Sequence, residues 1–275
     1  MNASARLETL PGLGLTPRLL TLAGCALLVL PQIIVIITSI DPSPAAIFPP
    51  KGISFEWYLN AFTRHAFREA LAISVIVASI AAVLSTTIGT MAAVFIVRRR
   101  FRGRELLIAA LQLPMLIPEV MLGLGFLILF SRAGMTASLF NIGLAHVLIT
   151  LPYAMRVVMA NLQTVSVSVE EAAHVLGAGP VKSFVSVTLP IIRSGVVAAL
   201  IFSFIVSFDN FTLTAFLVKS RGTLPIEIYA YIRTESDPTI AAISTLLIVV
   251  SIAGILAIER VMGIDKFSDA GGSAR

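Results

Sequence analysis

Charge and cysteine are both scarce in this 275-residue chain. Only 13% of its residues are charged, whereas 57% are hydrophobic. An ordinary soluble domain has about 25% charged residues, and a soluble fold of this size could not cover so much apolar surface. The composition therefore excludes a soluble protein and indicates an integral membrane protein. The single cysteine, Cys25, excludes a disulfide framework and a multi-cysteine metal site.

The chain also lacks the motifs of nucleotide-binding and catalytic proteins. The segment Gly177–Ser183 resembles a phosphate loop, but Val181 stands where a glycine must precede Lys182, so the backbone cradle for phosphates is missing. HExxH, GxSxG and Cys/His clusters are absent from the sequence. We therefore expect no enzyme, no catalytic residue, no metal site and no cofactor bound by this chain. The small net charge of +5 indicates no nucleic-acid partner.

Long apolar runs are what the sequence has in abundance. Six of them reach the roughly 20 residues that a membrane helix needs, and they predict an all-α, polytopic membrane protein. The spans are expected at residues 19–40, 69–97, 105–130, 139–159, 195–217 and 239–258. Residues 1–18 and 259–275 are expected to be polar tails, and residues 160–194 a loop. Leu22–Cys25 resembles a lipoprotein cleavage box, but too few apolar residues precede it for a signal peptide, so the first span is expected to stay uncleaved.

The distribution of Lys and Arg predicts how the spans are oriented. Positively charged residues favour cytoplasmic loops, and short loops next to a span weigh most. The short connection Arg98–Arg104, RRRFRGR, is the most basic segment of the chain. Placing this connection in the cytoplasm places both termini there too, together with the polar stretch Glu170–Pro190. We expect a multi-pass protein of a cell membrane, in contact with membrane lipid.

The stretch Glu170–Pro190, EEAAHVLGAGPVKSFVSVTLP, is polar although apolar spans flank it. Two acids in its first turn favour a short helix up to Leu176, and the Gly-Ala-Gly-Pro segment 177–180 ends that helix and turns the chain. A second short helix is expected over residues 181–188, ended by Leu189-Pro190. Two short helices joined at an angle form a compact projection that a partner protein can contact.

The spacing within this stretch resembles the EAA loop of the permease subunits of bacterial ABC importers. Its pattern is Glu-Ala-Ala at 171–173, then three intervening residues, Gly177, and Leu189-Pro190 at the end, with Val187 where isoleucine is more usual. The resemblance implies the type I ABC importer permease fold, with residues 160–194 as a cytoplasmic coupling loop that docks on an ATPase. The docking residues that it implies are Glu170, Glu171, Ala172, Ala173, Leu176, Gly177, Ala178, Val187, Leu189 and Pro190.

Further segments are similar to the polyamine branch of this family, which carries spermidine and putrescine. They include Pro118-Glu119, the Ser-Phe-Asp-Asn-Phe segment 207–211 and the Thr-Leu-Pro segment 223–225. The function implied is a membrane-spanning permease subunit of an ATP-driven, binding-protein-dependent importer for a small cationic or amino-bearing solute. Permeases for opines, 4-aminobutyrate and aminophosphonates are similar at the same places, and these solutes stay open as alternatives.

The resemblance also implies partners and a location. ATP and Mg would bind to a separate ABC ATPase, present in two copies, and an extracytoplasmic solute-binding protein would deliver the solute. Six spans are too few for a complete pathway of this type. A second permease subunit is therefore expected, as a distinct paralogue rather than a second copy of this chain. The implied location is the bacterial inner membrane.

Two acids fall inside expected spans, where a charge at the centre costs about 2.5–3.5 kcal/mol and usually serves a function. At a rise of 1.5 Å per residue, Glu119 and Asp209 lie roughly 21 Å from the cytoplasmic ends of their spans, and His146 lies at a similar depth. Two carboxylates at one level suit a cationic amine, and Asn210 adds a neutral contact. These four residues are the candidate substrate pathway.

Other roles for these residues remain open. Glu119 could bond to backbone groups freed by the prolines near it, and Asp209 could tie two helices together. His146 is a lone histidine on an apolar helix, so it could be a packing residue. The two acids could also be the ion sites of a secondary transporter, but such a protein needs inverted repeats, and the sequence shows no convincing internal symmetry.

Overall fold

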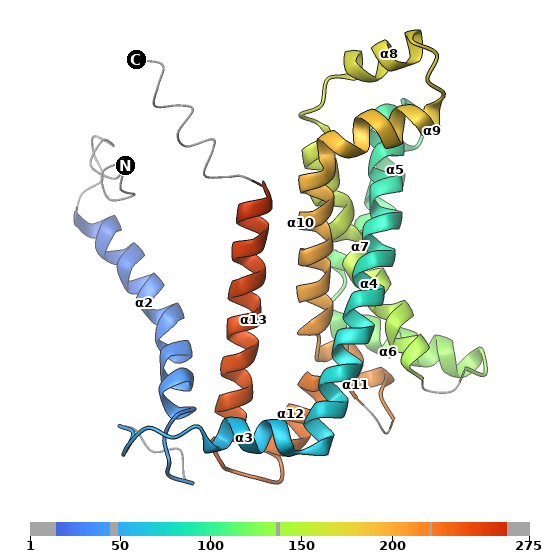
Figure 1. The fold of residues 1–275 in the computed structure, drawn as a ribbon. Helices are drawn as coiled ribbons and strands as arrows, with labels where there is room; N and C mark the ends of the chain where they lie inside the picture. Colours follow the sequence, from blue (N-terminus) through green and yellow to red (C-terminus); the bar gives the residue numbers. More distant parts are fainter. Residues whose placement is uncertain (1–14, 45–48, 136–137, 220–221, 263–275) are drawn as a thin grey trace. The chain divides into compact units, whose positions relative to one another are not determined.

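The computed structural model describes residues 15–44, 49–135, 138–219 and 222–262. Every regular element within these ranges is a helix (Figure 1), which confirms the all-α prediction. The chain divides into two compact units, one made of residues 1–61 and 235–248 and the other of residues 62–234 and 249–275. Each unit is described by itself. The predicted polar tails lie largely outside the described residues.

The first unit contains α2 (Leu15–Thr38), most of α3 (Glu56–Thr63) and the beginning of α13 (Thr239–Met262). α2 is apolar along its length and includes Pro31. Lipid-embedded helices tolerate such a proline better than soluble helices do. Many of its leucine and isoleucine side chains are exposed, as expected of a helix whose natural surroundings are hydrocarbon.

Asp41 organises the loop that follows α2. Its carboxylate accepts hydrogen bonds from the hydroxyl of Ser43 at 2.6 Å and from the backbone N–H of Ser43 at 3.1 Å. The Ser43 hydroxyl holds the pKa of the Asp41 carboxyl below its usual value. The Asp41 carbonyl accepts the indole N–H of Trp57 at 2.6 Å, and the hydroxyls of Ser39 and Tyr58 lie 2.7 Å apart. These contacts fix the two aromatic rings close to the end of the helix.

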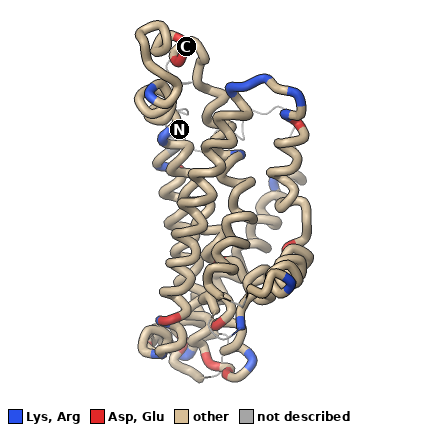
Figure 2. Tube along the Cα trace, turned by 90° about the vertical axis from the view of Figure 1, so that its right-hand side faces the viewer, with Lys and Arg blue, Asp and Glu red and all other residues tan. Residues whose placement is uncertain are grey.

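The second unit is built around three long helices that pack side by side: α4 (His65–Arg98), α7 (Leu139–Leu162) and α10 (Leu189–Phe208). Figure 2 shows that charged residues gather towards the ends of the long helices. α4, for example, has no Asp, Glu, Lys or Arg over residues 70–97. This charge-free stretch is long enough to cross the roughly 30 Å hydrocarbon core of a bilayer.

Small residues let these three helices approach one another closely. Ala78 on α4 is fully buried. A Cβ atom added at Gly89 would lie only 2.9 Å from the backbone nitrogen of Met155 on α7. A Cβ atom at Gly195 on α10 would lie 2.5 Å from the side chain of Asn161. Close contact through small residues is typical of helix packing in membranes, where burial of apolar surface does not drive association.

The apolar core contains two clusters. The cluster nearer the Arg98–Arg104 connection joins α4, α7 and α10, and its buried members are Ala93, Ile96, Ala154, Met155, Val158, Leu162, Val165, Ile192 and Ala199. The other cluster joins α4 and α7 to α6 (Glu119–Arg132) and α11 (Thr212–Leu217) through Ile73, Val77, Phe130, Ile142, Ala145, Ile149, Leu213 and Leu217. α6 and α11 therefore pack at the end of the bundle opposite to that connection. α12 (Leu224–Ile232) joins α4 there as well, since the Leu224 N–H donates to Ser74 Oγ at 2.7 Å.

The predicted span 105–130 is not one straight helix. α5 (Arg104–Leu116) and α6 meet at a bend of 100°. Ile117 is extended, with φ −87° and ψ 129°, because the ring of Pro118 disfavours the helical conformation in the residue before it. The described residues contain five helices long and apolar enough to cross a membrane, or six if the bent pair forms one span.

Three short helices lie between α7 and α10: α8 (Val167–Val175), α9 (Pro180–Ser183) and the π-helix η1 (Phe184–Thr188). The prediction that Leu189-Pro190 ends the second short helix is wrong, because α9, η1 and α10 follow one another without a break. Residues 180–208 accordingly form one apolar helical run, instead of a span that begins at Gly195. In a regular α-helix the Pro190 ring would collide with the carbonyl four residues earlier. We attribute the wider π turn just before the proline to this conflict.

The predicted span 195–217 also differs from the structure at its other end. α10 stops at Phe208 and α11 starts at Thr212, so the span is interrupted by residues 209–211. The interruption frees backbone groups at a level where the sequence offers polar side chains to bind them. It therefore places Asp209 and Asn210 in a break between helices instead of on a continuous helical face.

Candidate functional site

The turn between α8 and α9 explains the spacing of the Glu-Ala-Ala segment and the glycine. The N–H of Ala178 donates to the carbonyl of Ala173 at 3.0 Å, and the N–H of Gly177 donates to the carbonyl of His174 at 2.9 Å. These are the two bonds of a Schellman helix end. Gly177 has a φ of +85°, which glycine adopts without strain. Ala173 and Ala178, both half-buried, occupy the two positions that touch in this motif.

An exposed apolar patch surrounds this turn. Val175 is 87% exposed, Leu176 88% and Val181 77%. A contiguous apolar patch next to polar residues is typical of a surface that binds another protein. The Glu171 side chain is exposed and has no hydrogen-bond or ion-pair partner among the described residues. The sequence interpretation did not include Val175 and Val181 among the docking residues. Apolar residues within a short polar stretch could have indicated such a binding surface.

The structure places the other predicted docking residues in two groups. Those exposed together with Glu171 are Ala172, Leu176, Gly177 and Pro190. Those half-buried are Ala173, Ala178, Val187 and Leu189, together with Glu170. The exposed group gathers near the apolar patch, apart from Pro190, which lies at the start of α10. The docking role of both groups stays a prediction.

Glu170 turns inward, away from the exposed patch. Its Oε1 atom accepts hydrogen bonds from Arg98 Nε at 3.0 Å and from Thr188 Oγ1 at 2.8 Å, and Arg98 Nη2 lies 2.9 Å from the same oxygen. Arg98 Nη2 also donates to the carbonyl of Val165 at 3.2 Å. The Arg98 and Glu170 side chains are only 13% and 15% exposed. The carboxylate of Glu170 is thus engaged within the chain, and sequence reasoning did not identify Arg98 or Thr188 as its partners.

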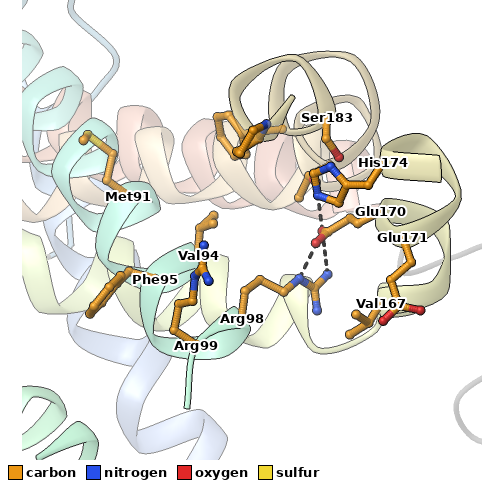
Figure 3. A pocket seen from close by; sticks show the side chains of 13 residues that line it. Met91, Val94, Phe95, Arg98, Arg99, Val167, Glu170, Glu171, His174 and Ser183 are labelled. Carbon is orange, nitrogen blue, oxygen red and sulfur yellow. Dashed lines mark hydrogen bonds and ion pairs between the residues drawn. The ribbon is translucent and has the colours of Figure 1, made fainter. Parts of the chain in front are cut away.

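A pocket of about 620 Å³ separates α8 from the end of α4 (Figure 3). Its α4 wall includes the apolar residues Met91, Val94 and Phe95, and its other walls come from α8, α9 and η1. The hydrogen bonds from Arg98 cross the space between α4 and α8 at one edge of this pocket. α8 is therefore held to α4 mainly by polar contacts.

The candidate pathway residues gather where α10 breaks. Asn210 Nδ2 donates to Glu119 Oε2 at 3.0 Å, and Asn210 Oδ1 accepts the N–H of Leu213 at 3.2 Å. Asn210 is buried, so its amide both caps the start of α11 and connects α11 to the first residue of α6. Glu119 stays exposed in spite of this contact.

His146 lies in the interior, bonded through both ring nitrogens. Nδ1 lies 2.7 Å from Ser207 Oγ on α10, and Nε2 lies 2.8 Å from Thr214 Oγ1 on α11. The Thr214 hydroxyl donates its one hydrogen to the carbonyl of Asn210 at 3.0 Å, so it accepts a hydrogen from Nε2. In a neutral ring, Nδ1 then accepts from Ser207. His146 is fully buried, and its contacts span the break between α10 and α11.

These contacts bring three of the four candidate pathway residues into one chain of hydrogen bonds, in which Thr214 links His146 to Asn210 and Asn210 contacts Glu119. The Asp209 side chain is exposed, and its carboxylate has no hydrogen-bond or ion-pair partner among the described residues, although its backbone N–H donates to the carbonyl of Ile205 at 3.1 Å. Sequence reasoning missed Thr214, although its spacing of four residues from Asn210 suits a bond to that carbonyl. Within the described ranges, groups of three or more His, Cys, Asp or Glu placed to hold a metal ion are not found.

Comparison with known proteins gives a consistent result. Residues 85–264 match the family described as binding-protein-dependent transport system inner membrane component. The putrescine transport system permease protein PotI of Escherichia coli (strain K12) is 32% identical over 246 residues, which cover 86% of this chain and 87% of the relative. The spermidine/putrescine transport system permease protein PotC of Haemophilus influenzae is 31% identical over 204 residues, covering 74% of this chain and 79% of the relative.

Solved structures share the fold at lower identity. A bacterial ABC transporter involved in the import of the acidic polysaccharide alginate matches with a TM-score of 0.70 and 17% identity, covering 94% of this chain and 98% of that one. The MetNI methionine ABC transporter in inward-facing conformations matches with a TM-score of 0.58 and 16% identity, covering 71% of this chain and 96% of that one. Because these identities are low, the likeness concerns the fold.

Proposed function

The chain belongs to the family of binding-protein-dependent transport system inner membrane components, and from this premise we propose that it carries a small cationic amine of the polyamine class. It is a multi-pass permease subunit with the fold of type I ABC importer permeases. The proposal concerns the solute, the separate partner proteins and the orientation in the membrane. The single observation that carries the solute class is the pair of exposed carboxylates, Glu119 and Asp209, on either side of Asn210.

A polyamine is a flexible chain with several ammonium groups, and each group loses hydration when it enters the membrane. Carboxylates offset this loss through charge-assisted hydrogen bonds. The Asp209 carboxylate has no partner among the described residues, so it is available to an ammonium group. Glu119 uses Oε2 for Asn210 and keeps its other oxygen for a ligand. The names of the relatives PotI and PotC, which refer to putrescine and spermidine, support the same solute class.

The exposed patch at Val175, Leu176 and Val181 supports docking of a separate ATPase, present in two copies. ATP and Mg would bind to that ATPase. Closing of the two ATPase subunits would draw paired coupling loops together and turn the spans towards the outward-open state, in which a binding protein delivers the solute. One solved structure of this fold contains a periplasmic protein with bound alginate pentasaccharide, which supports a binding protein as partner here.

The orientation that we propose places the coupling loop and both termini in the cytoplasm. Its support is the contact between Arg98 and Glu170, which puts the Arg98–Arg104 connection and the coupling loop at the same end of the second unit. A basic connection of this kind favours the cytoplasmic face. We propose that the second permease subunit is a distinct paralogue; the relatives' names, which describe a permease protein of a transport system, agree with a chain that works alongside other subunits.

Uptake by reconstituted transporter tests this proposal. The chain is purified with the ATPase and the second permease that accompany it, placed in liposomes, and supplied with the cognate binding protein and labelled putrescine or spermidine. We expect uptake that requires ATP inside and disappears when the Walker lysine of the ATPase is replaced. Uptake of an opine, 4-aminobutyrate or an aminophosphonate in place of the polyamines would overturn the solute class. Uptake driven by an ion gradient without ATP would overturn the importer mechanism.

A further inference from the structure

We propose that Glu170 is a positioning residue that ties the coupling loop to both α4 and α10, so that displacement of α8 moves these two helices together. The inference rests on the proposed function, since it takes the coupling loop as the segment that an ATPase displaces. It gives Glu170 a different role from its neighbour Glu171.

One oxygen atom of Glu170 joins three elements. Oε1 accepts from Arg98, the last residue of α4, and from Thr188, the last residue of η1 before α10 begins. Arg98 also holds the carbonyl of Val165, just before α8 starts. The end of α4 and the residue just before α10 therefore meet at a single carboxylate of α8, and Arg98 also holds the segment that leads into α8.

Few other contacts could connect α8 to the helix bundle. None of the residues Val167–Val175 of α8 is buried, so α8 lacks an apolar face that would fix it to the bundle. A pocket of about 620 Å³ is lined by residues of both α8 and the end of α4. Contacts to a charged group are short, directional and stronger than neutral hydrogen bonds, and the Arg98–Glu170 pair is shielded from solvent. This pair can therefore transmit a displacement that apolar contacts around an open pocket would absorb.

The geometry of a helix explains why two adjacent glutamates differ. Successive residues of an α-helix point about 100° apart. Glu170 accordingly bonds to Arg98 and Thr188, while the exposed side chain of Glu171 lines the same pocket without a hydrogen-bond or ion-pair partner among the described residues. Only the first glutamate of the pair is therefore bonded to α4 and η1, and the two should respond differently to the same substitution.

Hydrogen exchange of the assembled transporter tests the tie directly. In Glu170→Gln, we expect the amides of α8 to exchange about tenfold faster than in the wild type, because a charged partner is replaced by a neutral one. The amides of α4 should keep their wild-type rates. Val169→Ala is the control, since Val169 is an exposed residue of the same helix outside the predicted docking residues, and α8 should exchange at the wild-type rate.

A second measurement distinguishes a coupling role from a merely structural one. In liposomes, Glu170→Gln should continue to hydrolyse ATP while uptake falls, so that the number of ATP molecules consumed per solute rises about fivefold or more. The exchanged pair Arg98→Glu with Glu170→Arg should restore part of the wild-type ratio, because the ion pair is rebuilt. If Glu170→Gln does not insert into the membrane, Thr188→Val is the second variant, because it removes one contact to the same oxygen. It should raise both the exchange rate of the α8 amides and the number of ATP molecules consumed per solute.

The following results distinguish a failure of the proposed role of Glu170, its tie between α8 and the helices α4 and α10, from a failure of the proposed function. Unchanged α8 exchange in Glu170→Gln would overturn the tie, and so would a constant ratio of ATP to solute. Failure of the exchanged pair to recover any coupling would overturn the assignment of Arg98 as the partner. A wild-type chain that binds no ATPase would instead overturn the proposed function, and the exchange of α8 in the isolated chain would still decide whether Glu170 holds this helix.

Discussion

His146 is bonded to two hydroxyl groups that belong to different helices on the two sides of a break. Replacing it by alanine leaves the buried Ser207 hydroxyl without a partner, which costs about 1–3 kcal/mol. It also removes one contact of the Thr214 hydroxyl, which keeps its bond to the Asn210 carbonyl. We expect His146→Ala to lower the free energy of unfolding by about 2 kcal/mol or more, seen as a lower melting temperature in detergent.

Leu148→Ala is the control for the His146 measurement, because Leu148 lies on the same helix with its side chain exposed. It should melt close to the wild type. A melting temperature of His146→Ala equal to that of the control would show that the two hydroxyl contacts contribute little. Lowered uptake at full stability would instead place His146 on the solute pathway, as the sequence first suggested.

Asp209 should bind an ammonium group of the solute. Asp209→Asn keeps the shape and removes the charge, so we expect the KM for putrescine uptake to rise by about tenfold, the loss of one charge-assisted contact. The maximal rate should change much less. Glu105→Gln serves as control, since Glu105 pairs with Arg104 at the other end of the bundle. Unchanged uptake kinetics in Asp209→Asn would remove this acid from the pathway.

The turn between α8 and α9 offers a matched pair of glycines. Gly177 has a φ of +85° and Gly179 a φ of −67°, and neither has an atom within 4 Å of an added Cβ. Gly177→Ala is therefore strained by its backbone alone and should destabilise the turn by about 1 kcal/mol. We expect weaker binding of the ATPase in Gly177→Ala, measured by co-purification, and near-normal binding in Gly179→Ala. Equal binding of both variants would contradict a role for the turn's shape in docking.

The contact between α4 and α7 depends on the absence of a side chain at Gly89. A Cβ there meets Met155 and Ala154 at 2.9–3.1 Å, so Gly89→Ala should push the helices apart at a cost of about 1–3 kcal/mol. A Cβ atom added at Gly143 on α7 would have no atom within 4 Å. The Gly143→Ala variant should therefore be as stable as the wild type. Thermal melting of the two variants in detergent measures the difference. Equal melting temperatures would show that the helices shift without cost.

Sequence patterns predicted the helices but not their breaks and joins. Apolar runs located α2, α4, α7 and α13 to within a few residues, because hydrocarbon demands a fixed length, whereas the predicted span 195–217 missed both ends of α10 (Leu189–Phe208). The bend at Pro118 and the continuous path through Pro190 could not be separated by sequence, since both are prolines in apolar helical surroundings. Which one ends a helix depends on whether the preceding turn can widen, as η1 does before Pro190. Spacing likewise identified Glu170, but only tertiary packing shows that Arg98 and Thr188 surround it.

The orientation of the whole molecule can be measured by labelling single cysteines. In a Cys25→Ser background, Lys182→Cys should react with a membrane-impermeant maleimide only in inside-out vesicles, because Lys182 lies in the coupling loop. Lys219→Cys, exposed after α11 at the other end of the second unit, should react in intact, outer-membrane-permeabilised cells. The reverse pattern would overturn the placement of the basic connection in the cytoplasm.

The exposed leucine and valines around Gly177 have a consequence for the cell. Residues this apolar, outside the hydrocarbon and 77–88% exposed, are what chaperones and proteases recognise on incomplete assemblies. A chain synthesised in excess of its ATPase would present this signal continuously, whereas a docked chain would hide it. If the proposed docking holds, the abundance of the permease should therefore follow the supply of its partner, and the same surface should set the stoichiometry of the transporter.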